Sequence, residues 1–189
     1  QPLSRFSSGG LKIEIAGSTV SAQGKDITLD ITLDATCTKP LRICTRAGYR
    51  GWVYTQKTSP VSIKGSAGIG NRQIDIESPA TMALMDWTCG YMRRNTCWNW
   101  AASAATLVDG RSFGLNLSCG VNETSFTENA FWIDGVMTKV DTVNYVYDRS
   151  DLMKSWHVAS FDNKVDLVFH PEASRGEKIH AGFVASCFT

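Results

Sequence analysis

The chain has 189 residues, of which 43% are hydrophobic, and its nineteen lysines and arginines almost balance eighteen aspartates and glutamates. A chain of this length can form one substantial domain, burying about 70% of the surface that its unfolded form exposes. The near-neutral charge provides no long-range field for holding nucleic acid or an anionic membrane, so we expect neither as a partner.

Alternation of polar and apolar residues is the dominant pattern along the chain. It begins at residues 11–16 and is clearest at 26–34, where isoleucines and leucines fall on one face and threonines and aspartates on the other. Shorter runs of the same kind follow at residues 61–64, 72–76 and 165–170. No amphipathic helix is evident, so the sequence predicts an all-β chain.

Turn residues separate these predicted strands. Asp109-Gly110 and Asp134-Gly135 lie between β-prone runs and suit the positive φ angles of two-residue hairpin turns, and Asp162-Asn163 is a weaker third. The glycine-rich segment 65–70 has the wrong residue order for a dinucleotide loop, and we interpret it as a turn. The result is an antiparallel meander in which sequence neighbours pair.

The six cysteines are dispersed and contain no C-x-x-C pair, and the three histidines are not at ligand spacing with them. We therefore expect mostly free thiols, no metal site and no cofactor. No apolar run approaches the ~20 residues of a membrane span, and the N-terminus lacks the features of a signal peptide, so the expected location is the cytoplasm. The absence of repeats or linkers predicts a single β-rich domain over residues 1–189.

The segment 85–102 combines three tryptophans with an acid, two arginines and two asparagines. A strand that only fills a core has little use for these polar groups, because each one buried without a partner costs roughly 1–3 kcal/mol. The segment therefore predicts a pocket with aromatic and polar walls. It contributes the candidate ligand-binding residues Arg93, Trp98, Asn99 and Trp100.

A series of short motifs runs through the chain from this segment onward. They are DW at 86–87, RRNTCWNWA at 93–101, DGRSFGLNL at 109–117, TENAF at 127–131, Trp156, and DLVFHP at 166–171. In this order they resemble the bacterial family called domain of unknown function 2804, over about residues 60–184 and more loosely before. The chain departs from the family's usual glycines at Ser118-Cys119-Gly120-Val121.

The resemblance implies a fold but no substrate, because the family has no assigned activity. By its architecture it is more distantly similar to the lipocalin-like proteins of the carotenoid hydratase and tocopherol cyclase type. That similarity implies a lipocalin-like (calycin-type) barrel or a strongly curved sheet. Family members also extend beyond both ends of this chain, so we expect a truncated domain whose sheet missing family segments or a second chain would complete.

Two carboxylates are the candidate catalytic residues, Asp86 and Glu128. Asp86 could form a structural ion pair with an arginine, or it could act as an acid on a substrate. Strand parity places Glu128 on the same side as Ala130 and Trp132, so a buried Glu128 would need a partner such as Arg93 or a raised pKa. Asn129 and Trp132 complete the candidate ligand-binding set, while Asn99 falls on the face opposite Trp98 and Trp100 and suits cross-strand bonding equally well.

Three functional classes fit these residues. A binding protein would hold a small apolar or amphipathic molecule between aromatic walls. An enzyme on the same frame would use Asp86 or Glu128 to protonate an unsaturated lipid or isoprenoid-like substrate, with Arg93 as an anion clamp. A carbohydrate-binding sheet would require tryptophans that face solvent. The first class explains the tryptophans best, and whether any reaction is catalysed stays open.

Overall fold

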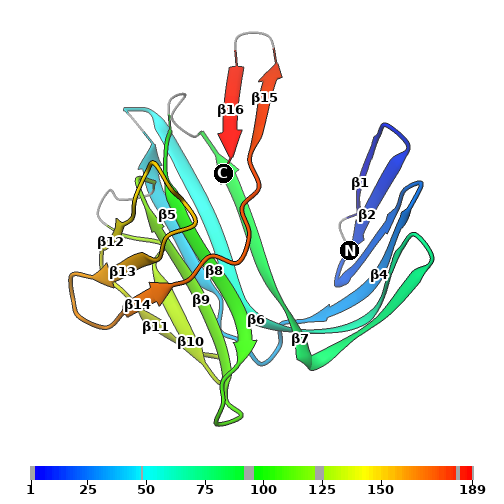
Figure 1. The fold of residues 1–189 in the computed structure, drawn as a ribbon, viewed down its shortest axis with the longest axis horizontal. Coiled ribbons are helices and arrows are strands. Elements are labelled where there is room, and N and C mark those ends of the chain that lie inside the picture. The colour runs from blue at the N-terminus through cyan, green and yellow to red at the C-terminus, as the bar shows by residue number, and fades with distance from the viewer. Residues whose placement is uncertain (1–2, 48, 92–95, 122–125, 182–183, 189) are drawn as a thin grey trace. The chain divides into compact units, whose positions relative to one another are not determined.

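The computed structural model describes residues 3–47, 49–91, 96–121, 126–181 and 184–188, and it divides the chain into two compact units, residues 1–139 and 140–189. Every regular element in the described residues is a strand (Figure 1). The all-β prediction is therefore confirmed, and the single-domain expectation stays a prediction.

Within the described residues, the strands of the two units follow one another without an intervening helix. In the first unit they are β1 (Leu3–Ser8), β2 (Leu11–Ala16), β3 (Thr19–Gln23), β4 (Ile27–Asp34), β5 (Leu41–Ala47), β6 (Gly51–Ile69), β7 (Arg72–Gly90), β8 (Asn99–Thr106), β9 (Ser112–Cys119), β10 (Ala130–Ile133) and β11 (Val136–Lys139). In the second unit they are β12 (Val143–Val146), β13 (Trp156–Ser160), β14 (Asp166–Phe169), β15 (Glu177–Ala181) and β16 (Val184–Phe188).

The long hairpin of β6 and β7 organises the first unit. The later part of β6 pairs with β4, at the end of the meander β1-β2-β3-β4, and its earlier part pairs with β5. The pairing of β6 with β7 shifts register between Thr58 and Val61 and again between Ser62 and Lys64. Such bulges bend a strand, and both long strands bend between their two halves (Figure 1).

Strict alternation gives the β1–β4 meander one polar and one apolar face. Arg5, Glu14, Ser21 and Asp30 form one cross-strand row, and the next row begins with Phe6. That row continues through isoleucine, alanine and leucine, as the period of two predicts. The sequence pattern thus fixes which residues share a face.

A second sheet has the strand order β11-β10-β9-β8, and it packs against the β5–β6–β7 part of the first. The Ser59 hydroxyl of β6 donates to the Ser103 carbonyl of β8 at 2.7 Å. Gly114 of β9 lies so close to the Ser59 carbonyl that a β-carbon would collide with it. The core between the sheets centres on Leu41, Ala130 and Trp132.

The hairpin turns lie where the sequence places them. Asp134 and Gly135 both have positive φ angles between β10 and β11, Gly110 does so between β8 and β9, and Asn163 between β13 and β14. The interpretation of residues 65–70 as a turn is wrong for most of the segment, because β6 continues to Ile69. Gly65 is needed inside the strand, since a side chain there would meet the backbone of Asp30.

The second unit contains a three-stranded antiparallel sheet, β12-β13-β14, and the hairpin β15–β16. Trp156 stacks on Tyr147 with ring centroids 4.0 Å apart and donates its indole N–H to the Leu152 carbonyl at 3.0 Å. Val143, Val158 and Val165 are the buried valines of the three-stranded sheet and the turn before β14.

The described strands form four antiparallel sheets and no closed barrel. Of the two predicted forms, a barrel or a strongly curved sheet, the structure is compatible with the curved sheet. Among the described cysteines, Cys37, Cys44, Cys89, Cys97 and Cys119 form no disulfide. Within the described ranges, no helix is long and apolar enough to span a bilayer.

Candidate functional site

A buried lysine is the centre of the candidate site. Val53, Thr55 and Lys57 alternate along β6 and all face the second sheet. The Lys57 side chain is only 5% exposed, which is rare for a lysine unless its ammonium group is paired. Its position inside the sandwich follows from the same period of two that points valine and threonine inward.

Two carboxylates from different parts of the chain flank this ammonium group. The Lys57 Nζ lies 2.5 Å from Asp86 Oδ2, which comes from the paired residue on β7. It also lies 3.8 Å from Glu128 Oε2, in the segment that leads into β10. The Glu128 side chain is 5% exposed and that of Asp86 is 33% exposed. Asp86 is thus the one of these three groups that solvent reaches.

Trp100 of β8 covers the lysine. Its ring centroid is 5.7 Å from Lys57 Nζ, a distance at which the cation and the indole face attract each other. The indole is 47% exposed, although its N–H donates to Asn116 Oδ1 at 2.9 Å. One part of Trp100 is therefore fixed on the protein while much of the ring remains accessible.

Buried amides hold the Glu128 segment against β9. The Asn116 side-chain amide donates to the Glu128 carbonyl at 2.8 Å, and the Asn129 side-chain oxygen accepts from the Ser118 backbone N–H at 2.6 Å. Lys139 Nζ donates to the Asn129 carbonyl at 2.7 Å. These bonds fix the backbone from which the Glu128 side chain extends. The Asn116 side chain also connects the Glu128 carbonyl to the Trp100 indole N–H.

The structure brings Asp86, Glu128 and Trp100 together around Lys57, and Asn129 follows Glu128 in the chain with its side chain bonded to Ser118. Trp132 lies in the core cluster instead, where its N–H donates to the Lys39 carbonyl at 2.6 Å. The remaining candidates are Trp98, which is exposed just before β8, Asn99, which pairs with Cys119, and Arg93, which lies outside the described residues.

Sequence reasoning missed Lys57 as the cation beside Glu128. The signal was present in the alternation of Val53, Thr55 and Lys57, continued by Val61 and Ile63 with the same parity. A lysine on the apolar side of such a strand predicts a buried charge and hence a carboxylate partner.

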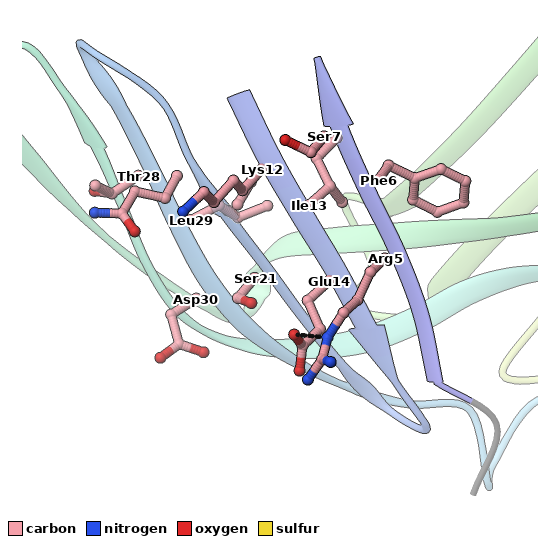
Figure 2. Close-up of a pocket in the computed structure, with 12 residues that line it drawn as sticks. Arg5, Phe6, Ser7, Lys12, Ile13, Glu14, Ser21, Thr28, Leu29 and Asp30 are labelled. Carbon is pink, nitrogen blue, oxygen red and sulfur yellow. Dashed lines mark hydrogen bonds and ion pairs between the residues drawn. The ribbon is translucent and has the colours of Figure 1, made fainter. Parts of the chain in front are cut away.

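A separate hollow of about 530 Å³ lies on the polar face of the β1–β4 meander (Figure 2). Its walls include Arg5, Lys12, Glu14, Ser21, Thr28 and Asp30. Arg5 and Glu14 pair across it at 2.8 Å, but both are well exposed, and such pairs are worth about 0–1 kcal/mol. The hollow holds none of the candidate residues. Although Phe6, Ile13, Ala22 and Leu29 also line it, its open shape differs from the enclosed pockets typical of small-molecule sites.

The family model for the domain of unknown function 2804 matches residues 4–189. The chain belongs to this family. The match extends to the β1–β4 meander, beyond the range of about 60–184 over which the motifs are recognisable, so it includes both the Lys57 site and the meander. No curated protein and no solved structure matches the chain.

Proposed function

We propose that this member of the domain of unknown function 2804 family binds a small amphipathic molecule at Asp86 and Trp100, between β7 and β8. The observation that carries the proposal is the Lys57 ammonium group, nearly buried, paired with two carboxylates and covered by a half-exposed indole. A buried ion cluster seldom improves stability over apolar packing, so its presence favours a functional role.

The accessible atoms indicate what kind of polar end the ligand carries. Asp86 Oδ2 is bound to Lys57, whereas Oδ1 accepts a long 3.3 Å bond from the Thr88 hydroxyl. A carboxylate oxygen of this kind attracts a hydroxyl or ammonium donor and repels another carboxylate. The ligand's apolar body would pack on the exposed part of the Trp100 ring, and Trp98 extends the aromatic surface.

The acids also have different roles in this proposal. Asp86 contacts the ligand, and Glu128, followed in the chain by Asn129, fixes the ammonium group from the buried side. An acid-catalysed reaction on an unsaturated substrate would use the same accessible Asp86, so ligands recovered after incubation should be analysed by mass spectrometry for conversion. The thiol state of the described cysteines suits a reducing compartment such as the cytoplasm.

Competition between matched amphiphiles tests the proposal. Saturable binding of Nile red is measured by fluorescence, and decylamine, decanol and decanoate then compete at concentrations below micelle formation. We expect the amine and the alcohol to displace the dye at least tenfold more effectively than the carboxylate. Absence of saturable dye binding, or equal displacement by all three, would refute the proposed site.

Two variants and one control variant locate the binding. Asp86→Asn keeps the shape of the side chain but removes its charge, and Trp100→Ala removes the aromatic wall. Both are expected to weaken dye or amine binding. Asp75→Asn provides the control, because Asp75 is an exposed aspartate on the same strand but in its other half. Equal binding by all variants would place the dye elsewhere on the protein.

A further inference from the structure

The outward face of the β5–β6–β7 segment carries a second group of aromatic and basic side chains. Because successive strand residues alternate between faces, Gln56 and Trp87 point away from the side on which Lys57 and Asp86 lie. Cross-strand pairing arranges the outward side chains in three rows. The rows are Arg42, Gln56 and Trp87, then Cys44, Tyr54 and Cys89, and finally Arg46, Trp52 and Tyr91.

The first row and Tyr54 form a small preorganised cluster. Arg42 Nε donates to Gln56 Oε1 at 2.8 Å, and the Tyr54 hydroxyl lies 3.5 Å from the same oxygen. The Trp87 indole is 57% exposed and meets the Tyr54 ring edge-on, with centroids 5.5 Å apart. The cluster therefore combines an exposed flat ring, an aromatic wall and planar donors from a guanidinium and an amide group.

The charge of this face is one-sided. Its nine positions include two arginines and no carboxylate. The chain as a whole has a formal net charge of only +1, so this local excess of positive charge is not part of a general basic surface. Arginine presents its N–H groups in a fork that matches a carboxylate, and exposed indoles offer a flat apolar surface to the C–H face of a sugar ring.

We propose that this outward face binds an acidic saccharide, with a uronate carboxylate on the Arg42 guanidinium and a sugar ring on Trp87. Gln56 is placed between them to donate to a ring hydroxyl. Two strand spacings separate the Arg42 and Trp87 backbones by about 9–10 Å, so both long side chains can reach one sugar residue between them. This site is independent of the amphiphile site, which uses the opposite face of the same strands.

The third row suggests a chain of sugars rather than a single one. Like the first row, it has an arginine on β5 and an aromatic residue at the β7 side, here Arg46 and Tyr91, with Trp52 between them. Arg46 lies four residues beyond Arg42, so the two rows are about 13 Å apart along the strands. Trp52 and Tyr91 also pack edge-on, with centroids 6.1 Å apart. An extended oligosaccharide lying along the strands would meet both rows.

Calorimetric titration with a galacturonate oligosaccharide and a neutral galactose oligosaccharide of equal length tests this inference. We expect saturable binding of the acidic sugar and at least tenfold weaker binding of the neutral one, since one charge-assisted contact is lost. Arg42→Gln and Trp87→Ala should each weaken acidic-sugar binding about tenfold or more. Arg72→Gln and Phe6→Ala, which change an exposed arginine and an exposed aromatic elsewhere in the first unit, should leave it unchanged.

Alkylation of cysteines gives a readout that does not depend on affinity alone. Cys44 is an exposed thiol in the middle row, and Cys37 is an exposed thiol outside the three rows. The acidic oligosaccharide should slow iodoacetamide labelling of Cys44 relative to Cys37 in the same molecules, as quantified by peptide mass spectrometry. The proposal is overturned by equal binding of both sugars, by unprotected Cys44 at saturation, or by Trp87-dependent binding of a single-stranded oligonucleotide in preference to the sugar. Nile red binding by Trp87→Ala tests separately whether the amphiphile site is intact.

Discussion

Removing the Lys57 charge is expected to destabilise the protein strongly, because it leaves Glu128 buried without this cation. At the observed 3.8 Å, and with an effective dielectric constant of about 20, the attraction between the two charges is about 4 kcal/mol. Breaking one side of a buried pair typically costs about 3–5 kcal/mol. We therefore expect Lys57→Met to lower the free energy of unfolding by that amount. Glu128→Gln should lower it less, because Lys57 then keeps Asp86.

A double-mutant cycle isolates the interaction from these single effects. The Lys57→Met/Glu128→Gln protein should be more stable than the sum of the single losses predicts, by more than about 1 kcal/mol. Urea denaturation followed by tryptophan fluorescence measures all four proteins. The matched cycle is Arg5→Gln with Glu14→Gln, an exposed pair for which coupling of about 0–1 kcal/mol is expected. Additivity in the Lys57 cycle would mean that the two side chains do not interact as described.

Three further changes test other parts of the structure. Asn116→Leu should cost about 1–3 kcal/mol in urea denaturation and weaken Nile red binding, because the Glu128 carbonyl and the Trp100 N–H lose their partner. Gly114→Ala should cost about 1–3 kcal/mol by forcing β9 away from Ser59, whereas Gly24→Ala, which has room for a methyl group, should not. Hydrogen bonds, first from Lys154 and then from Ser150, lower the pKa of Asp148 to about 2. This folded-state value is below the unfolded one, so the stabilisation is present above pH ~4 and is lost as pH falls toward 2. The stability difference between the native protein and Asp148→Asn should shrink over that range in a pH series of urea denaturations.

The elements that the sequence predicts correctly are those whose causes are local. The alternating residues of β2 and β4 and the Asp134-Gly135 turn depend on neighbours within a few positions, and each lies where the pattern indicates. The glycines at 65–70 were misinterpreted as a turn because the contact that requires a glycine comes from a residue far away in the sequence. Gly65 is required by the backbone of Asp30 on the neighbouring strand, which no local pattern reveals.

In the candidate site, too, the features with local causes could be predicted and the long-range pairings could not. Strand parity places Glu128 on the same side as Ala130 and Trp132, and the structure shows that this side is buried. The identity of its cation depends on how β6 faces the segment before β10, and such a pairing of distant residues requires the packing of two sheets. Trp132 was grouped with the site because strand parity puts it on the same side as Glu128. In the structure its N–H donates to the Lys39 carbonyl, and it belongs to the core cluster.

The register of β6 and β7 determines which chemistry each face of the sheet carries. If β7 slipped by one residue against β6, the side chains of β7 would turn to the opposite faces, so Asp86 would leave Lys57 and Trp87 would turn inward. The buried ion pair opposes that slip, because it is formed only in the observed register. Lys57 therefore contributes to the outward aromatic face without contacting it: by holding Asp86 inward, it keeps the indole of Trp87 in solvent.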